Sequence, residues 1–307
     1  MPVVPPAKRQ EVTVDGRSLS LSNLDKVFYP EVGFTKGQTI EYYTRVAPAL
    51  LPHLRGRPLT LKRYPNGVTG AHFYEKQCPS HAPEWVRTAP LYAGSKKIDF
   101  ILADDLATLV WLANLADLEL HTSLALAERY DSPTAIAFDL DPGPPATIVE
   151  CSEVALMLRE LLGRLGLEAW PKSSGSKGMQ VYAPLNTPTS YDQTKPFAHA
   201  IAQLLERREP KLIVSEMAKA KRGGRVFVDW SQNTRHKTTV NVYSLRARER
   251  PTVSTPLRWE EVEAATESRD PEDLAFTYDE VLARVEQHGD LFAPVLELRQ
   301  ELPAVAV

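Results

Sequence analysis

The sequence has little cysteine and no long hydrophobic run, and both absences narrow the possible classes of protein. Two cysteines among 307 residues, Cys78 and Cys151, cannot build a disulfide framework, and their spacing is not that of a zinc site. No segment has the uninterrupted apolar length of a membrane span. The N-terminus lacks the charged-then-apolar order of a signal peptide. We therefore expect a cytoplasmic protein that does not bind membranes.

A large charge of one sign is also missing, because the formal net charge is only −3. The net charge therefore gives no argument for nucleic-acid binding, but the distribution of charge along the chain does. Nine Lys or Arg and only two acids lie between positions 219 and 250. Most such clusters are solvated faces. Here the basic residues are interleaved with an apolar segment and flank Asp229, a pattern that suits a groove for phosphate groups.

The secondary structure predicted from periodicity mixes helices and strands without regular alternation. We expect a flexible arm at 1–10, one catalytic domain at 11–295 and a tail at 296–307, because no linker divides the chain. An α+β fold with central, largely antiparallel sheets flanked by helices fits this order best. The predicted helices are 36–54, 105–129 (with Asp104 as its N-cap), 147–165, 191–208 and 278–287. The predicted strands are 12–14, 19–21, 59–64, 97–102, 135–140, 180–184, 225–230 and 237–245.

Two carboxylates stand one residue apart at the end of the strand predicted at 135–140. Alternation along a strand places Asp139 and Asp141 on one face. Carboxylates held so close repel each other unless a cation lies between them or one is protonated. Mg²⁺ and Mn²⁺ prefer such oxygen ligands. The alternative is a simple turn, since Asp before Pro-Gly is common loop chemistry.

Three classes of enzyme use an Asp-x-Asp pair. A dehalogenase-type phosphohydrolase uses the first Asp as nucleophile, but it needs Thr or Val four residues later, where this sequence has Gly143. A glycosyltransferase uses the pair to hold the metal of a nucleotide sugar. A polymerase or primase adds a third, distant acid and holds two metals around a triphosphate. Asp229 ends a second apolar segment and is a candidate for that acid, so two metals and phosphate fit better than a sugar.

The segment Ser173-Ser-Gly-Ser-Lys-Gly is the candidate phosphate-binding loop. Glycines let backbone N–H groups turn toward an anion, and the hydroxyl groups and Lys177 add donors. The segment does not have the P-loop spacing. A Ser/Gly turn alone is often only a turn, but its place between two predicted strands favours a role in binding phosphate.

Several motifs together resemble the polymerase domain of bacterial ligase D, in the archaeo-eukaryotic primase superfamily. They are Phe138-Asp-Leu-Asp-Pro-Gly, Ser174-Gly-Ser-Lys-Gly, Val226-Phe-Val-Asp-Trp-Ser-Gln-Asn, Lys237-Thr-Thr, Tyr243-Ser-Leu-Arg, Asn23-Leu-Asp-Lys-Val-Phe-Tyr-Pro, Lys62-Arg-Tyr-Pro-Asn-Gly and Phe73-Tyr-Glu-Lys-Gln. The resemblance covers about residues 11–290. It implies a primase-polymerase fold and an enzyme that extends DNA ends during non-homologous end joining, often with ribonucleotides, using two Mn²⁺ or Mg²⁺ ions.

The resemblance also implies roles for individual residues. The metal-binding and catalytic residues would be Asp139, Asp141 and Asp229. The nucleotide-binding residues would be His121, Ser174, Lys177, Gln232, Lys237 and Arg246. Contacts to DNA would come from Lys26 and Lys36 to a recessed 5′-phosphate, from Phe73 and Tyr74 by stacking on template, and from Lys62, Arg63 and Arg222 to template phosphates.

The sequence departs from the family where Gln180 stands in place of a frequent His, and where the segment from His121 to Asp139 is shorter than in some members. The implied partners are primer-template DNA, an ATP-dependent DNA ligase and Ku. No Lys-x-Asp-Gly adenylation signature occurs, so we expect the polymerase without its ligase, alone or as part of a longer chain. Two other activities stay open: a primase that needs no primer, and a DNA-end binding module without catalysis.

Overall fold

The computed structural model describes residues 9–303. Most of the arm predicted at 1–10, and the end of the tail predicted at 296–307, therefore lie outside the described residues. Arg9 and Gln10 already belong to the first strand, and Glu297 closes the last helix. The division into arm, domain and tail stays a prediction.

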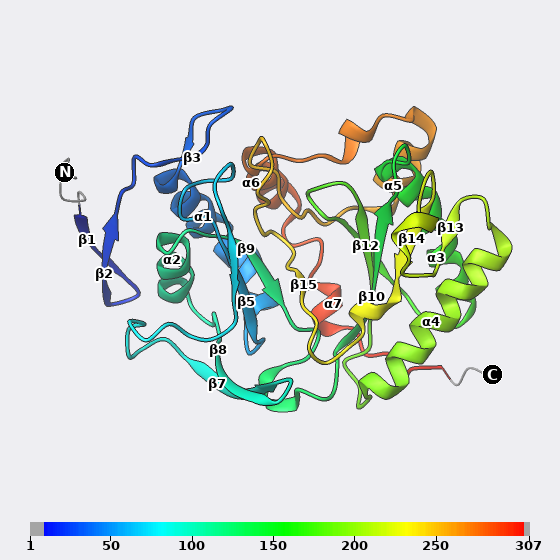
Figure 1. Cartoon of the computed structure of the whole chain (residues 1–307), viewed down its shortest axis with the longest axis horizontal. Helices are drawn as coiled ribbons and strands as arrows, with labels where there is room; N and C mark the ends of the chain where they lie inside the picture. Colours follow the sequence, from blue (N-terminus) through cyan, green and yellow to red (C-terminus); the bar gives the residue numbers. More distant parts are fainter. Residues whose placement is uncertain (1–8, 304–307) are drawn as a thin grey trace.

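Two central sheets lie between two layers of helices (Figure 1). A five-stranded sheet has the order β11-β12-β10-β14-β13, and a four-stranded sheet has the order β15-β9-β5-β6. Three two-stranded ribbons, β1-β2, β3-β4 and β7-β8, complete the described strands. All these pairs are antiparallel except β13-β14. The predicted α+β fold with largely antiparallel sheets is confirmed.

The described strands are β1 (Arg9–Val14), β2 (Arg17–Ser22), β3 (Val27–Tyr29), β4 (Phe34–Thr35), β5 (Leu59–Arg63), β6 (Phe73–Glu75), β7 (Thr88–Ala93), β8 (Lys96–Ile101), β9 (Asp117–Thr122), β10 (Ala135–Pro142), β11 (Trp170–Ser173), β12 (Met179–Pro184), β13 (Ile213–Val214), β14 (Val226–Asp229) and β15 (Thr239–Val240). The described α-helices are α1 (Lys36–Leu54), α2 (Leu106–Asn114), α3 (Ile148–Arg164), α4 (Tyr191–Arg208), α5 (Trp259–Ser268), α6 (Tyr278–His288) and α7 (Pro294–Glu297).

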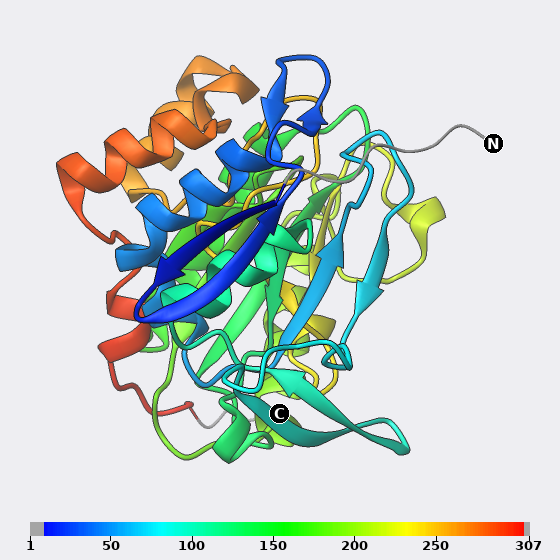
Figure 2. The same cartoon turned by 90° about the vertical axis from the view of Figure 1, so that its left-hand side faces the viewer.

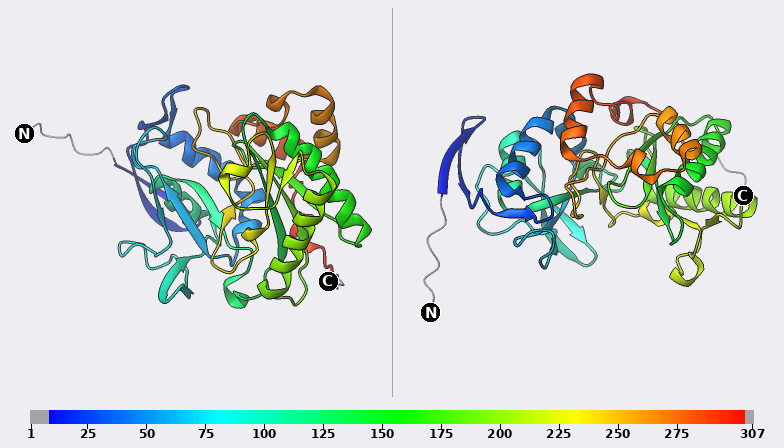
Figure 3. Two further views of the ribbon diagram at one scale, coloured as in Figure 1. Left: turned by 45° about the vertical axis from the view of Figure 1, so that its right-hand side comes forward. Right: turned by 90° about the horizontal axis from the view of Figure 1, so that it is seen from above.

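The helices α1 and α2 lie on one side of the central sheets, and α3 and α4 lie on the other (Figure 3). The β1-β2 ribbon runs across the outside of α1 and α2, and the β7-β8 ribbon reaches away from the body (Figure 2). Among the helices of residues 9–303, none combines the length and the apolar character that crossing a bilayer requires.

Alternation along β10 decides where its acids lie. Ile136, Phe138 and Leu140 are fully buried in the apolar cluster that α3 and α4 form on one face of the five-stranded sheet. Asp139 and Asp141 alternate with them and must project from the opposite face. The burial of the apolar residues therefore fixes the register, because a slip by one residue would send the carboxylates into the apolar core.

The single helix predicted at 105–129 is wrong. The helix α2 ends at Asn114, and its N-cap is Asp105, which accepts a hydrogen bond from Thr108 N at 2.8 Å. Ala116 then adopts a left-handed φ of 63°, and the chain continues as the strand β9. The segment Asp117-Leu-Glu-Leu-His-Thr alternates polar and apolar residues, which is the period of a strand. The dense apolar run before it hides this change of period.

The strand predicted at 237–245 is also wrong in length. Only β15, Thr239–Val240, pairs with β9. Tyr243 follows with a left-handed φ of 64°, which interrupts an extended backbone. Several short elements were not predicted at all, among them β6, β7 and α5. Their sequences carry weak or mixed periodicity, and packing against neighbouring elements decides their conformation.

The described structure predicts one pH-dependent contribution to stability. Asp290 lies 2.7 Å from His53 Nε2 and accepts a hydrogen bond from Tyr243 Oη at 2.7 Å. Burial would raise the pKa of Asp290, but the hydrogen bond and charge of His53 and the hydroxyl of Tyr243 lower it below its usual value. Since the unfolded chain has an Asp pKa of about 3.9, this stabilisation is complete above that pH and is lost as the pH falls through the lower folded-state pKa.

We expect Asp290→Asn to lower the free energy of unfolding by roughly 2 kcal/mol at neutral pH. Urea denaturation of both proteins at pH 7, and again below about pH 4, measures the difference. It should shrink in acid, because protonation of Asp290 removes the carboxylate charge from the wild type there. A difference that is equal at both pH values would contradict a role for the ionised carboxylate.

Candidate active site

A cavity of about 370 Å³ opens between the two central sheets. Side chains from both sheets and from the loops between them line it. The cavity brings together the predicted residues Tyr74, His121, Asp139, Asp141, Ser174, Lys177, Gln232 and Arg246. It also includes Ser176, Gly178, Gln180, Thr238, Thr239 and Val240, which were not among the predicted site residues.

A row of polar residues crosses four strands of the five-stranded sheet beside this cavity, and two of them, Asp139 and Gln180, line it. Lys172 on β11 stands opposite Gln180 on β12, Gln180 stands opposite Asp139 on β10, and Asp139 stands opposite Asp229 on β14. Directly opposed residues of antiparallel strands have their side chains close together. Two acids about 90 residues apart in the chain are therefore neighbours because β10 and β14 pair.

Nearby basic residues compensate the charge of Asp139 and Asp141 only in part, because the pKa values of both are still raised. Burial, followed by the charge of Asp141, raises the pKa of Asp139 to about 7. Partial burial and the charge of Asp229 raise the pKa of Asp141. Gln180 Nε2 donates to Asp139 Oδ1 at 3.0 Å, which stabilises one carboxylate oxygen without adding charge. Such mutually raised pKa values are typical of carboxylates that bind a cation.

Asp229 is buried and held by donors of its own loop. Its Oδ1 accepts a hydrogen bond from Ser231 N at 2.9 Å, and its Oδ2 accepts one from Gln232 Nε2 at 2.9 Å. Lys237 Nζ donates to the Ser231 hydroxyl group and lies 3.9 Å from Asp229 Oδ2. Gln232 and Lys237 thus adjoin the third acid, and Gln232 also lines the cavity.

The chemistry of the three candidate ligands suits a hard divalent cation. The three acids offer only oxygen, which Mg²⁺ and Mn²⁺ prefer, and the raised pKa values indicate that a positive charge would stabilise the cluster. Within the described part of the chain, however, no three His, Cys, Asp or Glu side chains are gathered into one metal-binding group. The hydrogen bonds of Asp229 to its own loop engage both of its carboxylate oxygens.

The candidate phosphate-binding loop follows β11 and precedes β12. Ser174 Oγ accepts hydrogen bonds from Ser176 N and Gly178 N, each at 3.2 Å. Gly175 has a φ of 65°, and a Cβ at this position would lie 2.5 Å from the carbonyl carbon of Val253. Glycine is therefore required here by both conformation and space. The loop presents Ser174, Ser176 and Lys177 to the cavity.

One buried carboxylate beside the cavity was not predicted as a site residue. Glu119 on β9 is 2% exposed and contacts His121, Lys62 and Arg246. Burial would raise the pKa of Glu119, but the hydrogen bond from His121 and the charges of Arg246 and Lys62 hold it well below its usual range. Recognising β9 as a strand would have shown that Glu119 and His121 share one face.

Arg222 lies closer to the acids than its predicted role as a template contact requires. Its Nη1 is 3.9 Å from Asp141 Oδ2, and its guanidinium stacks 3.7 Å from the ring centroid of Phe227. Gly143 makes this approach possible, because a Cβ there would lie 1.9 Å from the Arg222 carbonyl oxygen. The glycine of the Asp-Pro-Gly segment therefore has a packing role.

The predicted contacts to a 5′-phosphate lie around the start of α1. Lys26 is exposed, and its Nζ donates to Asn66 Oδ1 at 3.0 Å. Lys36 is only 5% exposed, and its Nζ donates to the Ser22 carbonyl oxygen at 2.6 Å. Burial, and then the charge of Lys26, lower the pKa of Lys36 to about 8. The two lysines are close enough to interact electrostatically, and only Lys26 is freely accessible.

The predicted aromatic contacts lie on the short strand β6, at the edge of the four-stranded sheet. Phe73 is 44% exposed and Tyr74 is 60% exposed, so both rings reach solvent. Arg63 lies over Phe73 and Lys62 lies over Tyr74, at 5.2 and 5.6 Å from the ring centroids. The ring centroid of Tyr74 is 6.0 Å from that of His121, so this aromatic edge adjoins the cavity.

Comparisons with known proteins agree with this geometry. The family model described as "LigD, primase-polymerase domain" matches residues 35–292. The multifunctional non-homologous end joining protein LigD of Mycolicibacterium smegmatis is 42% identical over 277 residues, which are 90% of this chain and 36% of that protein. The bifunctional non-homologous end joining protein LigD of Bacillus subtilis is 32% identical over 290 residues, which are 94% of this chain and 46% of that protein.

The chain thus spans less than half the length of these two relatives. Its structure is similar to the polymerase domain from Mycobacterium tuberculosis ligase D in complex with DNA, with a TM-score of 0.85 and 39% identity. That match covers 92% of this chain and 99% of the other. The chain therefore belongs to the family of LigD primase-polymerase domains and is a nucleotidyltransferase.

Proposed function

We propose that this primase-polymerase extends the 3′ ends of primer strands on a DNA template during end joining or gap repair. It would add NTPs in preference to dNTPs and act at the nucleoid in the cytoplasm. One observation carries the proposal: Asp139 and Asp141, the candidate phosphate-binding loop and Tyr74 of the aromatic edge line a single cavity, and Asp229 stands opposite Asp139 beside it. The printed names of the relatives, which place them in non-homologous end joining, support the biological setting.

We propose that Asp139, Asp141 and Asp229 hold two divalent ions, Mn²⁺ or Mg²⁺. Such ions, when bound, stabilise both the attacking and the leaving oxygen of a displacement at phosphorus. Ser174, Lys177 and Arg246 would bind the triphosphate, because their hydroxyl, ammonium and guanidinium groups line the same cavity as Asp139 and Asp141. His121, Gln232 and Lys237 would position the nucleotide beside them.

DNA would approach along the exposed side of the four-stranded sheet. Phe73 and Tyr74 can stack on template bases of any identity, which is worth about 1–3 kcal/mol per base. Lys62, Arg63 and Arg222 would contact template phosphates. The 39% identical polymerase domain is described as a complex with DNA, which supports this assignment. Lys26 and Lys36 would bind the 5′-phosphate of the strand downstream of a gap.

The test uses a gapped duplex with either a 5′-phosphate or a 5′-hydroxyl on the downstream strand, Mn²⁺, and NTPs or dNTPs. We expect templated addition that favours NTPs and is stimulated by the 5′-phosphate. Template without primer tests for primase activity in the same series. No addition in spite of tight DNA binding would support a DNA-end binding module instead.

Lys26→Ala is the sharper probe of the 5′-phosphate site. Lys26 is exposed, whereas Lys36 also holds the Ser22 carbonyl oxygen, so its removal would disturb the fold. We expect Lys26→Ala to remove most of the stimulation by the 5′-phosphate and to leave extension of 5′-hydroxyl DNA unchanged. The matched control is Lys211→Ala, at an exposed lysine after α4. Equal stimulation in all three proteins would contradict the site.

We also propose that an ATP-dependent DNA ligase and Ku act with this domain. The support is that the matching relatives are at least twice as long and are named as multifunctional or bifunctional end joining proteins. A nick-sealing assay with the polymerase, Ku and a ligase, each omitted in turn, tests the partnership.

A further inference from the structure

We propose that Glu119 is a positioning residue that holds Arg246, His121 and Lys62 in place for the nucleotide and the template. The inference rests on the proposed function, because it assumes that Arg246 and His121 contact the incoming nucleotide. The inference assigns a role to a carboxylate that is not one of the proposed metal ligands. No step of the proposed reaction requires this carboxylate to react.

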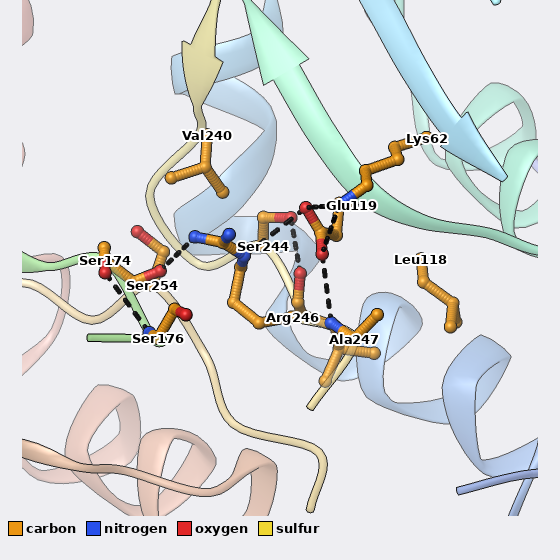
Figure 4. A network of polar contacts seen from close by, with 12 residues as sticks. Lys62, Leu118, Glu119, Ser174, Ser176, Val240, Ser244, Arg246, Ala247 and Ser254 are labelled. Carbon is orange, nitrogen blue, oxygen red and sulfur yellow. Dashed lines mark hydrogen bonds and ion pairs between the residues drawn. The ribbon is translucent and has the colours of Figure 1, made fainter. Parts of the chain in front are cut away.

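Three basic side chains lie around the carboxylate of Glu119. Its Oε2 lies 3.0 Å from His121 Nε2 and 3.4 Å from Arg246 Nε. Its Oε1 lies 3.3 Å from Lys62 Nζ. Figure 4 shows Glu119 between Lys62 and the Arg246 segment. One buried acid therefore touches residues predicted for the triphosphate, the nucleotide and the template.

Neighbouring neutral donors fix the orientation of this carboxylate. The Ala247 N–H donates to Glu119 Oε1 at 3.1 Å, and Tyr64 Oη donates to the same oxygen at 3.3 Å. Glu119 itself is 2% exposed. A buried charge with this many donors is rigidly held and stays ionised. It is therefore a fixed point against which flexible basic side chains can be aligned.

Arg246 carries the effect of Glu119 to the phosphate-binding loop. Its Nη1 donates to the Ser174 carbonyl oxygen at 2.5 Å, while its Nε faces Glu119. Arg246 is 16% exposed and lines the cavity. Glu119 on β9 of the four-stranded sheet is thus linked through Arg246 to a loop attached to the five-stranded sheet (Figure 4).

Arg246 and Lys62 would repel each other without the charge of Glu119, and Arg246 would lose one of the two contacts that orient it. The change Glu119→Gln keeps the size of the side chain but removes the charge, and its amide nitrogen cannot accept a hydrogen bond. We expect Glu119→Gln to raise the KM for nucleotide about 10-fold or more, as is common when the supporting partner of a binding residue is lost. The kcat should fall less, and the affinity for DNA should change less than the KM for nucleotide, because Lys62 is one of several proposed template contacts.

The matched control is Glu261→Gln, which removes the charge of a carboxylate that is less buried than Glu119 but also has arginine partners. Glu261 pairs with Arg284 at 2.6 Å and lies on α5, outside the residues that line the cavity. We expect this variant to lose stability but to keep the wild-type KM. Thermal unfolding of both variants separates a general loss of stability from a specific effect on nucleotide binding.

A double-mutant cycle with Arg246→Lys distinguishes positioning from a merely structural role. If Glu119 acts through Arg246, adding Glu119→Gln to Arg246→Lys will raise the KM little beyond the single Arg246 variant. If Glu119→Gln does not fold, Glu119→Asp keeps the charge with a shorter reach and should show a smaller rise in KM.

A wild-type KM in folded Glu119→Gln, a lower KM, or additive effects in the cycle would overturn the inference. None of these outcomes touches the proposed function, which would fail only if the wild-type protein itself added no nucleotide.

Discussion

Replacing Asp229 by alanine is expected to abolish primer extension and to spare DNA binding. Asp229 stands directly opposite Asp139 across the β10-β14 pair, so its removal takes away one of the three carboxylates proposed to hold the metals. Losing a group that stabilises developing charge typically lowers kcat by about 100-fold or more. Affinity for DNA should not fall, because the change removes a negative charge and affinity depends on neutralising phosphates.

The experiment compares extension and DNA binding in Asp229→Ala, in Asp229→Asn and in Glu267→Ala. The asparagine keeps an oxygen that can accept the hydrogen bond from Ser231, so it separates loss of charge from loss of loop structure. Glu267 is an exposed acid on α5 and should be neutral when replaced. Extension at the wild-type rate by folded Asp229→Ala would show that the metal assignment is wrong.

The change Gly143→Ala is expected to disable the enzyme almost as completely, although Gly143 has no functional group. The added Cβ would lie 1.9 Å from the carbonyl oxygen of Arg222, and backbone cannot yield as a flexible side chain can. The Gly143 N–H also donates to the Arg225 carbonyl oxygen at 2.8 Å. The segment carrying Arg222 must therefore move away from β10. Since Arg222 lies beside Asp141, we expect Asp139, Asp141 and Asp229 to lose their relative positions.

The matched control for Gly143→Ala is Gly163→Ala. Gly163 is an exposed glycine near the end of α3, and a Cβ there meets no atom within 4 Å. Alanine is preferred to glycine inside a helix by about 1 kcal/mol, so this variant should be slightly more stable and fully active. Extension and thermal unfolding of both variants test the contrast. Full activity in Gly143→Ala would mean that the approach of Arg222 does not shape the site.

Local sequence patterns predicted the elements that have one clear period. The helix α1 has the predicted bounds, 36–54, because its apolar residues follow a helical spacing and Thr35 caps it. The strand β10 could be recognised because its apolar run ends in acids. The failure at 105–129 has a physical cause: the change from helical to strand period is confined to a single turn at Ala116, inside an apolar region.

The cavity itself could not be predicted from local sequence patterns, because it forms only when strands distant in the sequence pair. Nothing in the segment around Asp229 indicates that β14 will pair with β10, or that Gln180 and Lys172 will extend the same row. The resemblance to a known family predicted most of the residues that line the cavity, because the motifs of that family come from a fold in which these strands pair. It passed over Glu119, whose importance is visible only once His121, Lys62 and Arg246 are seen around one carboxylate.

Template-directed incorporation on a primer-template duplex tests the central claim most directly. Each of the four nucleotides would be offered singly with Mn²⁺, opposite each template base, and both the extended primer and the released product would be measured. The account predicts addition of the complementary nucleotide with release of one pyrophosphate for each addition. Release of inorganic phosphate without extension, or DNA binding with no addition at all, would contradict it.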